Sequence, residues 1–387
     1  MAAVDHPPVT GRTRRLLAVL LVPLLAATVA GVVVWWPDGS GDRLELSGTP
    51  EDASVVAVRE VACADTAPAA GIDCLRVEAR LDSGGRVALE ELAGPFLDGA
   101  PVAVGDEVVV SREGAGGDVR YELVGFERTS SLALAGVVAA AALLVLARWR
   151  GLRLLVALVL SGGVLVLFAV PALLDGAPPG GVAAVAGALV ATALVLVGRG
   201  LDVRHLTALT GTLLALAAAA AIALALTDVT VTGGLRPPVP QLVDLLVVGM
   251  VVGATGALVD LATRLVDATW DLRDTNPDSR WFGITRAGMR RGRAAYADVS
   301  ATLVLAYAGV AVPLLTILVA DQSLLEVLQR EELAAELVRA IAGVAALATV
   351  VPLTAAVAAT VIVLESRRNG PDDPRRFRSK KERDIWG

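Results

Sequence analysis

Eight apolar runs, most of them near 20 residues long, constrain the fold of this chain more than any other feature. About 20 apolar residues in a helix are enough to cross the hydrocarbon core of a bilayer. With 55% hydrophobic and 19% charged residues, the 387-residue chain lacks the polar surface of a water-soluble protein. We therefore expect an α-helical integral membrane protein in contact with the lipid bilayer. The runs are 16–36, 131–147, 152–174, 182–198, 206–226, 242–265, 299–320 and 339–364.

The first run could also be a cleaved signal peptide, because Arg12, Arg14 and Arg15 precede it. Its apolar part is longer than the usual 7–15 residues of a signal sequence, and no small-x-small cleavage site follows it. The run ends in Trp35 and Trp36, which suits an aromatic anchor at a membrane interface. We expect an uncleaved first transmembrane helix at 15–36.

Basic residues indicate the orientation of the helices. Five segments rich in Arg or Lys alternate with connections that are poor in cations, and such clusters mark the cytoplasmic side. With eight crossings, all five lie on one side, so both termini are expected in the cytoplasm. The clusters comprise Arg12, Arg14 and Arg15; Arg148, Arg150 and Arg153; Arg199 and Arg204; six arginines between 273 and 293; and eight cations in the tail 366–387.

Residues 37–130 form the predicted domain outside the cytoplasm. From Asp38 to Arg128, 19 acidic residues face 8 arginines, a balance of −11, which leaves +5 for the rest of a chain of net charge −6. Short alternating runs separated by glycine turns predict a small all-β domain, barrel-like and of OB or SH3-like type. It could be a passive cap or a module that binds a partner. The expected strands are 54–61, 75–82, 86–91, 107–112 and 120–126.

Both cysteines of the chain, Cys63 and Cys74, lie in this domain. Outside the cytoplasm a disulfide is permitted, and neither cysteine has another partner. The same spacing also suits two free thiols in a loop. We expect the disulfide.

The sixth apolar run has the most informative pattern. Three glycines and three charged residues are spaced by three or four positions, so they fall on one helix face. Glycines allow close helix contact, and charges at this depth are expected to face other helices or water. Asp260 and Arg264 can pair across one helical turn. The face consists of Gly249, Gly253, Gly256, Asp260, Arg264 and Asp267.

Asp298, near the start of the seventh run, could meet the level of Asp260, or it could cap a helix N-terminus. Likewise, the charges of the sixth run could form only a structural ion pair near the interface. We predict instead that the seam between the sixth and seventh helices is the functional centre, with Asp260 as its main polar group.

Several stretches resemble the YibE/F family of bacterial multi-pass membrane proteins. They are GATGALVDLA at 253–262, ATWDLRDTNP at 268–277, RAGMRRGR at 286–293, TLVLAYAGVAVPLL at 302–315, and the segment 323–354. The apolar runs and the basic segments predict a seven-helix bundle at 131–365 after the outer domain, with a cytoplasmic loop at 268–297 and a basic cytoplasmic tail at 366–387. The resemblance implies a protein of the bacterial cytoplasmic membrane with a role in transport.

We expect a transport-related component; the alternative is a membrane scaffold or sensor whose β domain binds a partner or an envelope component. A polar cavity that reaches Asp260 would favour transport. We expect no enzyme, no catalytic residue, no metal and no cofactor, because the sequence lacks HExxH, GxSxG and P-loop motifs. Nucleic acid is not expected as a partner, since no basic face is large enough. A second copy of the chain or another membrane protein is left open as a partner.

Overall fold

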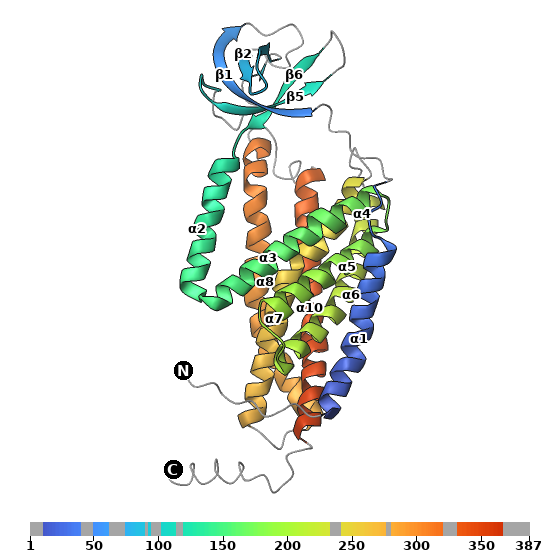
Figure 1. Ribbon diagram of the computed structural model, residues 1–387. Coiled ribbons are helices and arrows are strands. Elements are labelled where there is room, and N and C mark those ends of the chain that lie inside the picture. Colours follow the sequence, from blue (N-terminus) through green and yellow to red (C-terminus); the bar gives the residue numbers. More distant parts are fainter. Residues whose placement is uncertain are drawn as a thin grey trace. The chain divides into compact units, whose positions relative to one another are not determined.

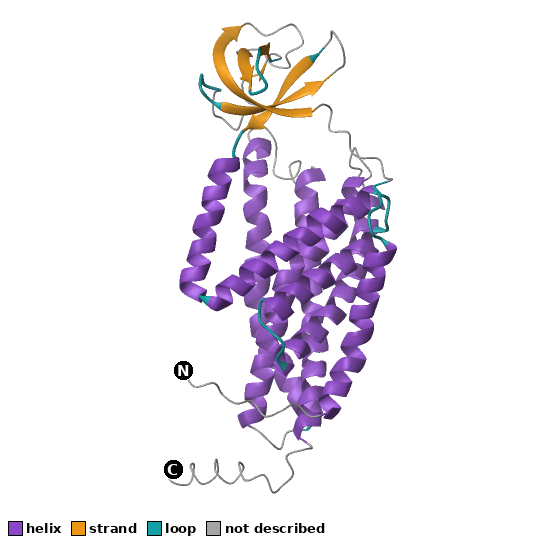
Figure 2. Cartoon of the chain, in the orientation of Figure 1, coloured by secondary structure: helices purple, strands orange, loops and turns teal. Residues whose placement is uncertain are grey.

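The computed structural model describes residues 11–39, 49–61, 74–89, 92–93, 102–113, 119–232, 241–275, 280–319 and 331–366. The chain divides into two compact units. One comprises 1–41 and 144–387 and is helical, and the other comprises 42–143 and contains all the described strands. Figure 2 shows this segregation of helix and strand. Each unit is described by itself.

The strands of the second unit form one curled antiparallel sheet in the order β3-β2-β1-β5-β6, with β4 paired to β2 (Figure 1). Alternate residues of β1, β2 and β5 point to one face and form its core, which includes Val55, Val77 and Val108. The strands are β1 (Thr49–Val61), β2 (Cys74–Leu81), β3 (Arg86–Ala88), β4 (Leu92–Ala93), β5 (Glu107–Glu113) and β6 (Arg120–Phe126).

The predicted β content is confirmed, and each of the five expected strands matches an observed one within a few residues. Among the described residues β6 pairs only with β5, so a curled sheet is observed and the closed barrel stays a prediction. Cys63 lies outside the described residues, so the Cys63–Cys74 disulfide also stays a prediction.

Eight helical segments are long and apolar enough to cross a membrane, as expected, judged by length and composition within the described ranges. Seven of them belong wholly to the first unit, whereas α2 divides at Leu144 and falls mostly in the second. Two segments contain a π-helical stretch. The helices are α1 (Gly11–Val34), α2 (Thr129–Ala147), α3 (Trp149–Val164) continued by η1 (Leu165–Ala169) and α4 (Val170–Leu174), α5 (Pro179–Thr192) continued by η2 (Ala193–Val197), α6 (Val203–Thr232), α7 (Gln241–Thr275), α8 (Trp281–Val319) and α10 (Glu331–Ser366).

The last three helices are longer than the apolar runs that predicted them. The segment 268–297, expected as a loop, is helical where described, because α7 continues to Thr275 and α8 begins at Trp281. Two glycines in this segment explain the packing of the extension. A Cβ at Gly288 would lie 3.0 Å from Oγ1 of Thr269, and one at Gly292 would lie 2.9 Å from Leu265, so α8 approaches α7 closely there.

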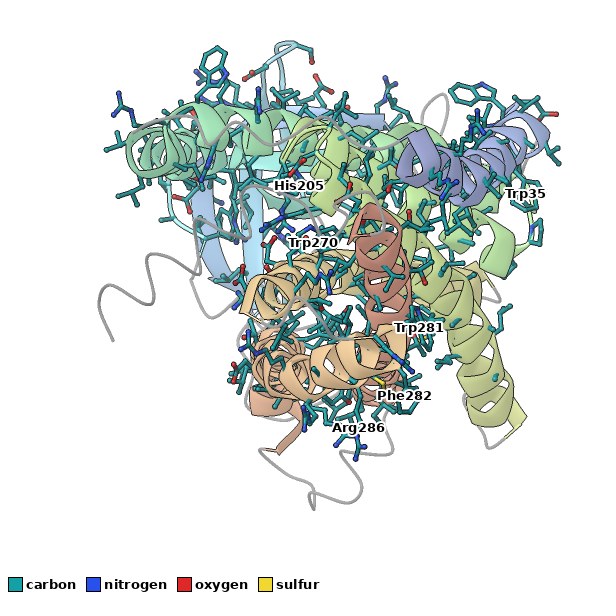
Figure 3. The ribbon with its side chains drawn as sticks, turned by 90° about the horizontal axis from the view of Figure 1, so that it is seen from below. Trp35, His205, Trp270, Trp281, Phe282 and Arg286 are labelled. Carbon is teal, nitrogen blue, oxygen red and sulfur yellow. The ribbon has the colours of Figure 1, made fainter. Side chains whose placement is uncertain are left out.

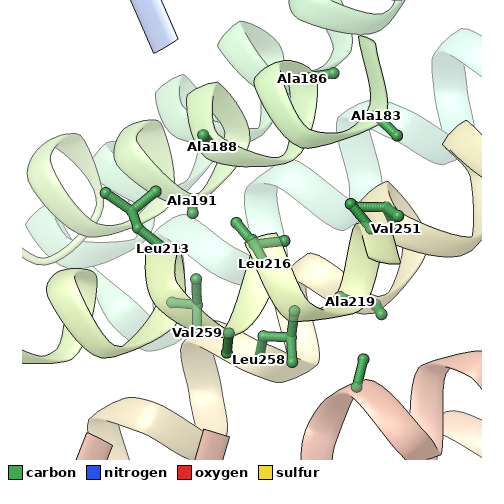
Figure 4. Packing of buried hydrophobic residues seen from close by; sticks show 14 of the residues in the cluster. Ala183, Ala186, Ala188, Ala191, Leu213, Leu216, Ala219, Val251, Leu258 and Val259 are labelled. Atoms are coloured by element: carbon green, nitrogen blue, oxygen red, sulfur yellow. The ribbon is translucent and has the colours of Figure 1, made fainter. Parts of the chain in front are cut away.

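Helices α5, α6, α7 and α10 form the centre of the bundle. Small side chains of α5, such as Ala183 and Ala191, face larger ones of α6 and α7, such as Leu216 and Val251 (Figure 4). Alternating small and large residues lets these helices interlock. Helix α10 also packs along α8, which places α7, α8 and α10 in mutual contact.

Candidate functional site

A groove between α7 and α8 contains two of the three carboxylates that the sequence singled out, Asp260 and Asp298. Its volume is about 300 Å³, and it extends from Gly253 to Arg264 along α7. Asp260 and Arg264 come from α7, and Asp298 and Thr302 come from α8. The remaining lining is apolar: Ala257, Val299, Leu303 and Ala306. The groove therefore combines a few charged groups with an apolar wall.

The predicted face of α7 is its least buried face. Gly253, Gly256, Arg264 and Asp267 are exposed, and residues between them such as Leu258 and Leu261 are fully buried. At Gly249 and Gly253 the face turns toward α10 and α8, and a Cβ on Gly253 would collide with the Tyr307 hydroxyl. A Cβ on Gly256 would meet no atom within 4 Å. Close contact is therefore made at Gly253 and is absent at Gly256.

Asp260 lies between two arginines. Its Oδ2 accepts a hydrogen bond from Nε of Arg264 at 2.8 Å, and its Oδ1 lies 3.7 Å from Nη2 of Arg199. The pairing with Arg264 across one turn was predicted from the spacing. The approach of Arg199, 61 positions away in sequence, was not. Each oxygen of the Asp260 carboxylate therefore has its own cation.

The π-helical end of α5 positions Arg199. The wider turns of η2 end at Val197, and the backbone N–H of Arg199 donates to the carbonyl of Val195. Its guanidinium donates to the Thr263 hydroxyl and, at 3.3 Å, to the Val259 carbonyl of α7. Burial lowers the pKa of Arg199, and Asp260 and Asp267 act against that shift. A guanidinium remains charged nonetheless, so Arg199 is a fixed cation behind Asp260.

Asp267 is not part of the groove lining. Its Oδ1 lies 3.9 Å from Nη1 of Arg204 at the start of α6, and the Arg204 guanidinium also lies 5.8 Å from the centroid of the Trp270 ring. Figure 3 shows Trp270 beside the first turn of α6 and away from Trp281 and Phe282 at the start of α8. Asp267 thus joins α7 to α6 and not to α8.

Asp298 lies in the interior of α8, 17 positions after its first residue, Trp281. It therefore does not cap the N-terminus of that helix, which was the alternative to a place beside Asp260. Its backbone carbonyl accepts a hydrogen bond from the Thr302 hydroxyl at 3.1 Å. The structure brings Asp298 to the same groove as Asp260, as the sequence suggested.

Comparison with known families decides the identity of the bundle. Residues 135–363 match the family model of YibE/F-like proteins. The chain belongs to the YibE/F-like family. No curated protein and no solved structure matches it. The suspected resemblance is thereby confirmed, and all the groove residues lie inside the matched region of this YibE/F-like protein.

A second polar group in this YibE/F-like protein lies on the same side of α7 as the groove. Glu336 and Arg339 of α10 form an ion pair, and a Cβ added at Gly249 of α7 would lie 3.5 Å from Nε of Arg339. The sequence analysis did not single out these two residues. Glu336 falls in 321–338, which has the composition of a cation-poor connection, and Arg339 is the first residue of the eighth apolar run. Their spacing of three on a helix was the available signal.

Within the described residues, no three His, Cys, Asp or Glu side chains gather as the ligands of a metal ion would. Asp260 of the groove is instead paired with the guanidinium groups of Arg264 and Arg199. Such pairs leave carboxylate oxygens able to accept protons or hydrogen bonds.

Proposed function

We propose that this YibE/F-like protein is a multi-pass protein of the bacterial cytoplasmic membrane with a transport-related role, centred on the groove between α7 and α8. Eight long apolar helices and the family assignment fit a membrane protein. Both termini, the segment 268–297 and the tail 366–387 lie in the cytoplasm, and the β unit lies on the opposite side, in keeping with the Arg-rich segments. The protein is not an enzyme.

The observation that carries this proposal is the 300 Å³ groove that holds Asp260, Asp298 and Arg264. Ionisable groups within membrane-spanning helices are costly, and they mark ion or substrate pathways when they face a cavity. The Asp260 side chain is 37% exposed and that of Arg264 is 61% exposed, so both are open to the groove. A binding role for this groove explains why the side chains of Asp260 and Arg264 are exposed and not buried between helices.

A scaffold or sensor role would be favoured by an apolar patch on the β unit. Among the described residues of its strands and turns, the large apolar side chains that are strongly exposed are Val104 and Val124. Two such residues are ordinary for a protein surface. The groove therefore supports transport more directly than the sheet supports a partner-binding role.

Cysteine accessibility tests the proposal. In a background with Cys63→Ser and Cys74→Ser, a membrane-impermeant thiol reagent is added to intact cells and to inverted membrane vesicles. Thr302→Cys in the groove should be labelled, whereas Leu305→Cys, 70% exposed on the outward side of α8, should not be labelled because lipid covers it.

Ser279→Cys and Ser379→Cys report the side of the membrane in the same experiment. Both should react in inverted vesicles and not in intact cells. Labelling of either in intact cells would refute the orientation, and failure of Thr302→Cys to react in both preparations would refute a water-filled groove.

A further inference from the structure

The Glu336–Arg339 pair resembles the Asp260–Arg264 pair but lies deeper in the protein. Side chains of Glu336 and Arg339 are 17% and 29% exposed, and both belong to the segment Leu333–Glu365 that is long enough to cross a membrane. Nε of Arg339 is buried and has no hydrogen-bond partner among the described residues. A buried donor without an acceptor is costly, so water or another mobile group is expected to satisfy it.

Tyr307 lies between this pair and the groove. Its hydroxyl is buried, has no hydrogen-bond partner within the described part of the chain, and sits where a Cβ on Gly253 would be. Tyr307 is within electrostatic range of Arg339 and Glu336. Gly253 is also a lining residue of the groove. The hydroxyl therefore lies at the end of the groove that points toward Glu336 and Arg339.

The glycine face of α7 aligns these groups in one row. Gly249, which faces Arg339, and Gly253, which faces Tyr307, are four residues or about 6 Å apart along the axis, and Asp260 follows about 10 Å further. The row thus runs from Glu336 and Arg339, past the Tyr307 hydroxyl, into the groove with Thr302, and ends at Asp260 and Asp298. A volume of about 300 Å³ has room for several waters.

We propose that this row is a proton pathway, with Glu336 and Asp260 as its terminal carboxylates and the Tyr307 hydroxyl as the link between them. The inference rests on the proposed function and names the proton as the transported or coupling species. The Glu336 carboxylic acid gives its proton to a water between the two side chains, because the Tyr307 hydroxyl has no hydrogen-bond partner among the described residues. That water gives a proton to the Tyr307 oxygen as the phenolic proton passes to water in the groove. The groove water gives a proton to Asp260, so each O–H bond broken is replaced by one formed, and no electrons are exchanged.

The charges around the two carboxylates favour a proton over a metal cation. Glu336 is paired with Arg339, whereas Asp260 is paired with Arg264 and Arg199 and shares the groove with Asp298. Each carboxylate is already balanced by at least one guanidinium, so a metal cation would meet little net negative charge. A proton binds covalently to a single oxygen, and the neighbouring guanidinium stays charged.

Proton flux in liposomes tests this pathway. The full chain is reconstituted with a pH-sensitive dye inside, and a potassium gradient with valinomycin drives protons across the membrane. Liposomes that contain the wild-type protein should show a higher proton flux than protein-free liposomes. Tyr307→Phe and Glu336→Gln should each lower this flux on the order of a hundredfold, the usual cost of removing a proton-transfer group.

Two matched variants control for the substitutions themselves. Tyr296→Phe makes the same change on α8, at a hydroxyl that donates to the Val344 carbonyl at 3.4 Å and does not line the groove. Glu365→Gln makes the same change at the opposite end of α10. Both should retain wild-type flux, and Glu336→Asp, which keeps a carboxylate, should retain more flux than Glu336→Gln.

The outcomes separate this pathway from the proposed function. Wild-type flux in Tyr307→Phe and Glu336→Gln, or no flux above empty liposomes in the wild type, overturns the pathway. Labelling of Thr302→Cys in the same preparation would then leave the transport-related groove standing. Variants that lose flux count only if they elute from size exclusion as the wild type does. If Glu336→Gln does not, Tyr307→Phe against Tyr296→Phe provides the test.

Discussion

Two acid–arginine pairs with the same chemistry occupy different surroundings in the bundle. Asp260–Arg264 on α7 lies in an open groove, with side chains 37% and 61% exposed, and Arg199 supports it from the end of α5. Glu336–Arg339 on α10 is more enclosed, at 17% and 29%, and faces Gly249 and Tyr307. The spacing of two opposite charges on a helix predicts that they pair. The neighbouring helices decide how far the pair is buried, and therefore how much stability is lost when one partner is removed.

The largest effect is expected from breaking the enclosed pair. Arg339→Met should lower the free energy of unfolding by about 3–5 kcal/mol, because it leaves the Glu336 carboxylate buried beside Tyr307 without its cation. Thermal or denaturant unfolding of the purified protein, followed by tryptophan fluorescence, measures the change.

A second variant guards against a general packing defect. Replacing both residues, with Glu336→Leu and Arg339→Met together, removes the buried charge entirely and should recover most of the lost stability. A double variant as unstable as the single one would show that the guanidinium acts through packing alone.

An intermediate effect is expected where the row passes between α7 and α8. Gly253→Ala should destabilise the protein by about 1–3 kcal/mol, because the new methyl group would collide with the Tyr307 hydroxyl. Gly256→Ala is the matched control on the same face, where a Cβ would meet no atom within 4 Å. It should be neutral or stabilising by up to about 1 kcal/mol through helix propensity.

The hydroxyl can be tested directly as the source of that collision. In the Tyr307→Phe background the colliding oxygen is absent, and the next atom of the ring lies 3.4 Å from the position of the new methyl group, which is ordinary contact. Gly253→Ala should then cost little in unfolding measurements. An equal loss in both backgrounds would place the Tyr307 ring somewhere other than beside Gly253.

Apolar runs and helical periodicity predicted a large part of this architecture. The apolar runs located the eight helices, and the spacing from Gly249 to Asp267 correctly placed its residues on one face of α7. The partners of that face could not be predicted, because no single-helix pattern states which neighbour approaches. Arg199 meets Asp260 through the π-helical end of α5, and Tyr307 meets Gly253 through the packing of α8.

The Arg-rich start of α8 and the acidic start of α10 were missed for a different reason. Charged residues interrupt the apolar runs of both segments, which is the pattern of a connection. Both segments are helical because one side of each packs on neighbouring helices and the other side carries charged residues. The packing residues are Gly288 and Gly292 in α8 and Leu333 in α10.

The smallest loss of stability is expected at the exposed Asp260–Arg264 pair, and it tests most directly whether exposure separates this pair from Glu336–Arg339. Arg264→Met removes a 2.8 Å hydrogen bond to Asp260, but Arg199 remains 3.7 Å away on the other carboxylate oxygen. Because the Arg264 side chain is 61% exposed, water in the groove would solvate both groups, and the loss should stay below about 1 kcal/mol.

Replacing both cations distinguishes a wet groove from a dry one. If water fills the groove, Arg264→Met and Arg199→Met together should cost little more than the sum of the two single variants, because solvent continues to stabilise the ionised Asp260. If the groove is dry, Asp260 would be left as an unpaired charge, and the double variant should lose about 3 kcal/mol or more beyond that sum. Urea unfolding of the four proteins in this double-mutant cycle measures the difference. A large excess loss would contradict both the water-filled groove and the proton pathway that enters it at Tyr307.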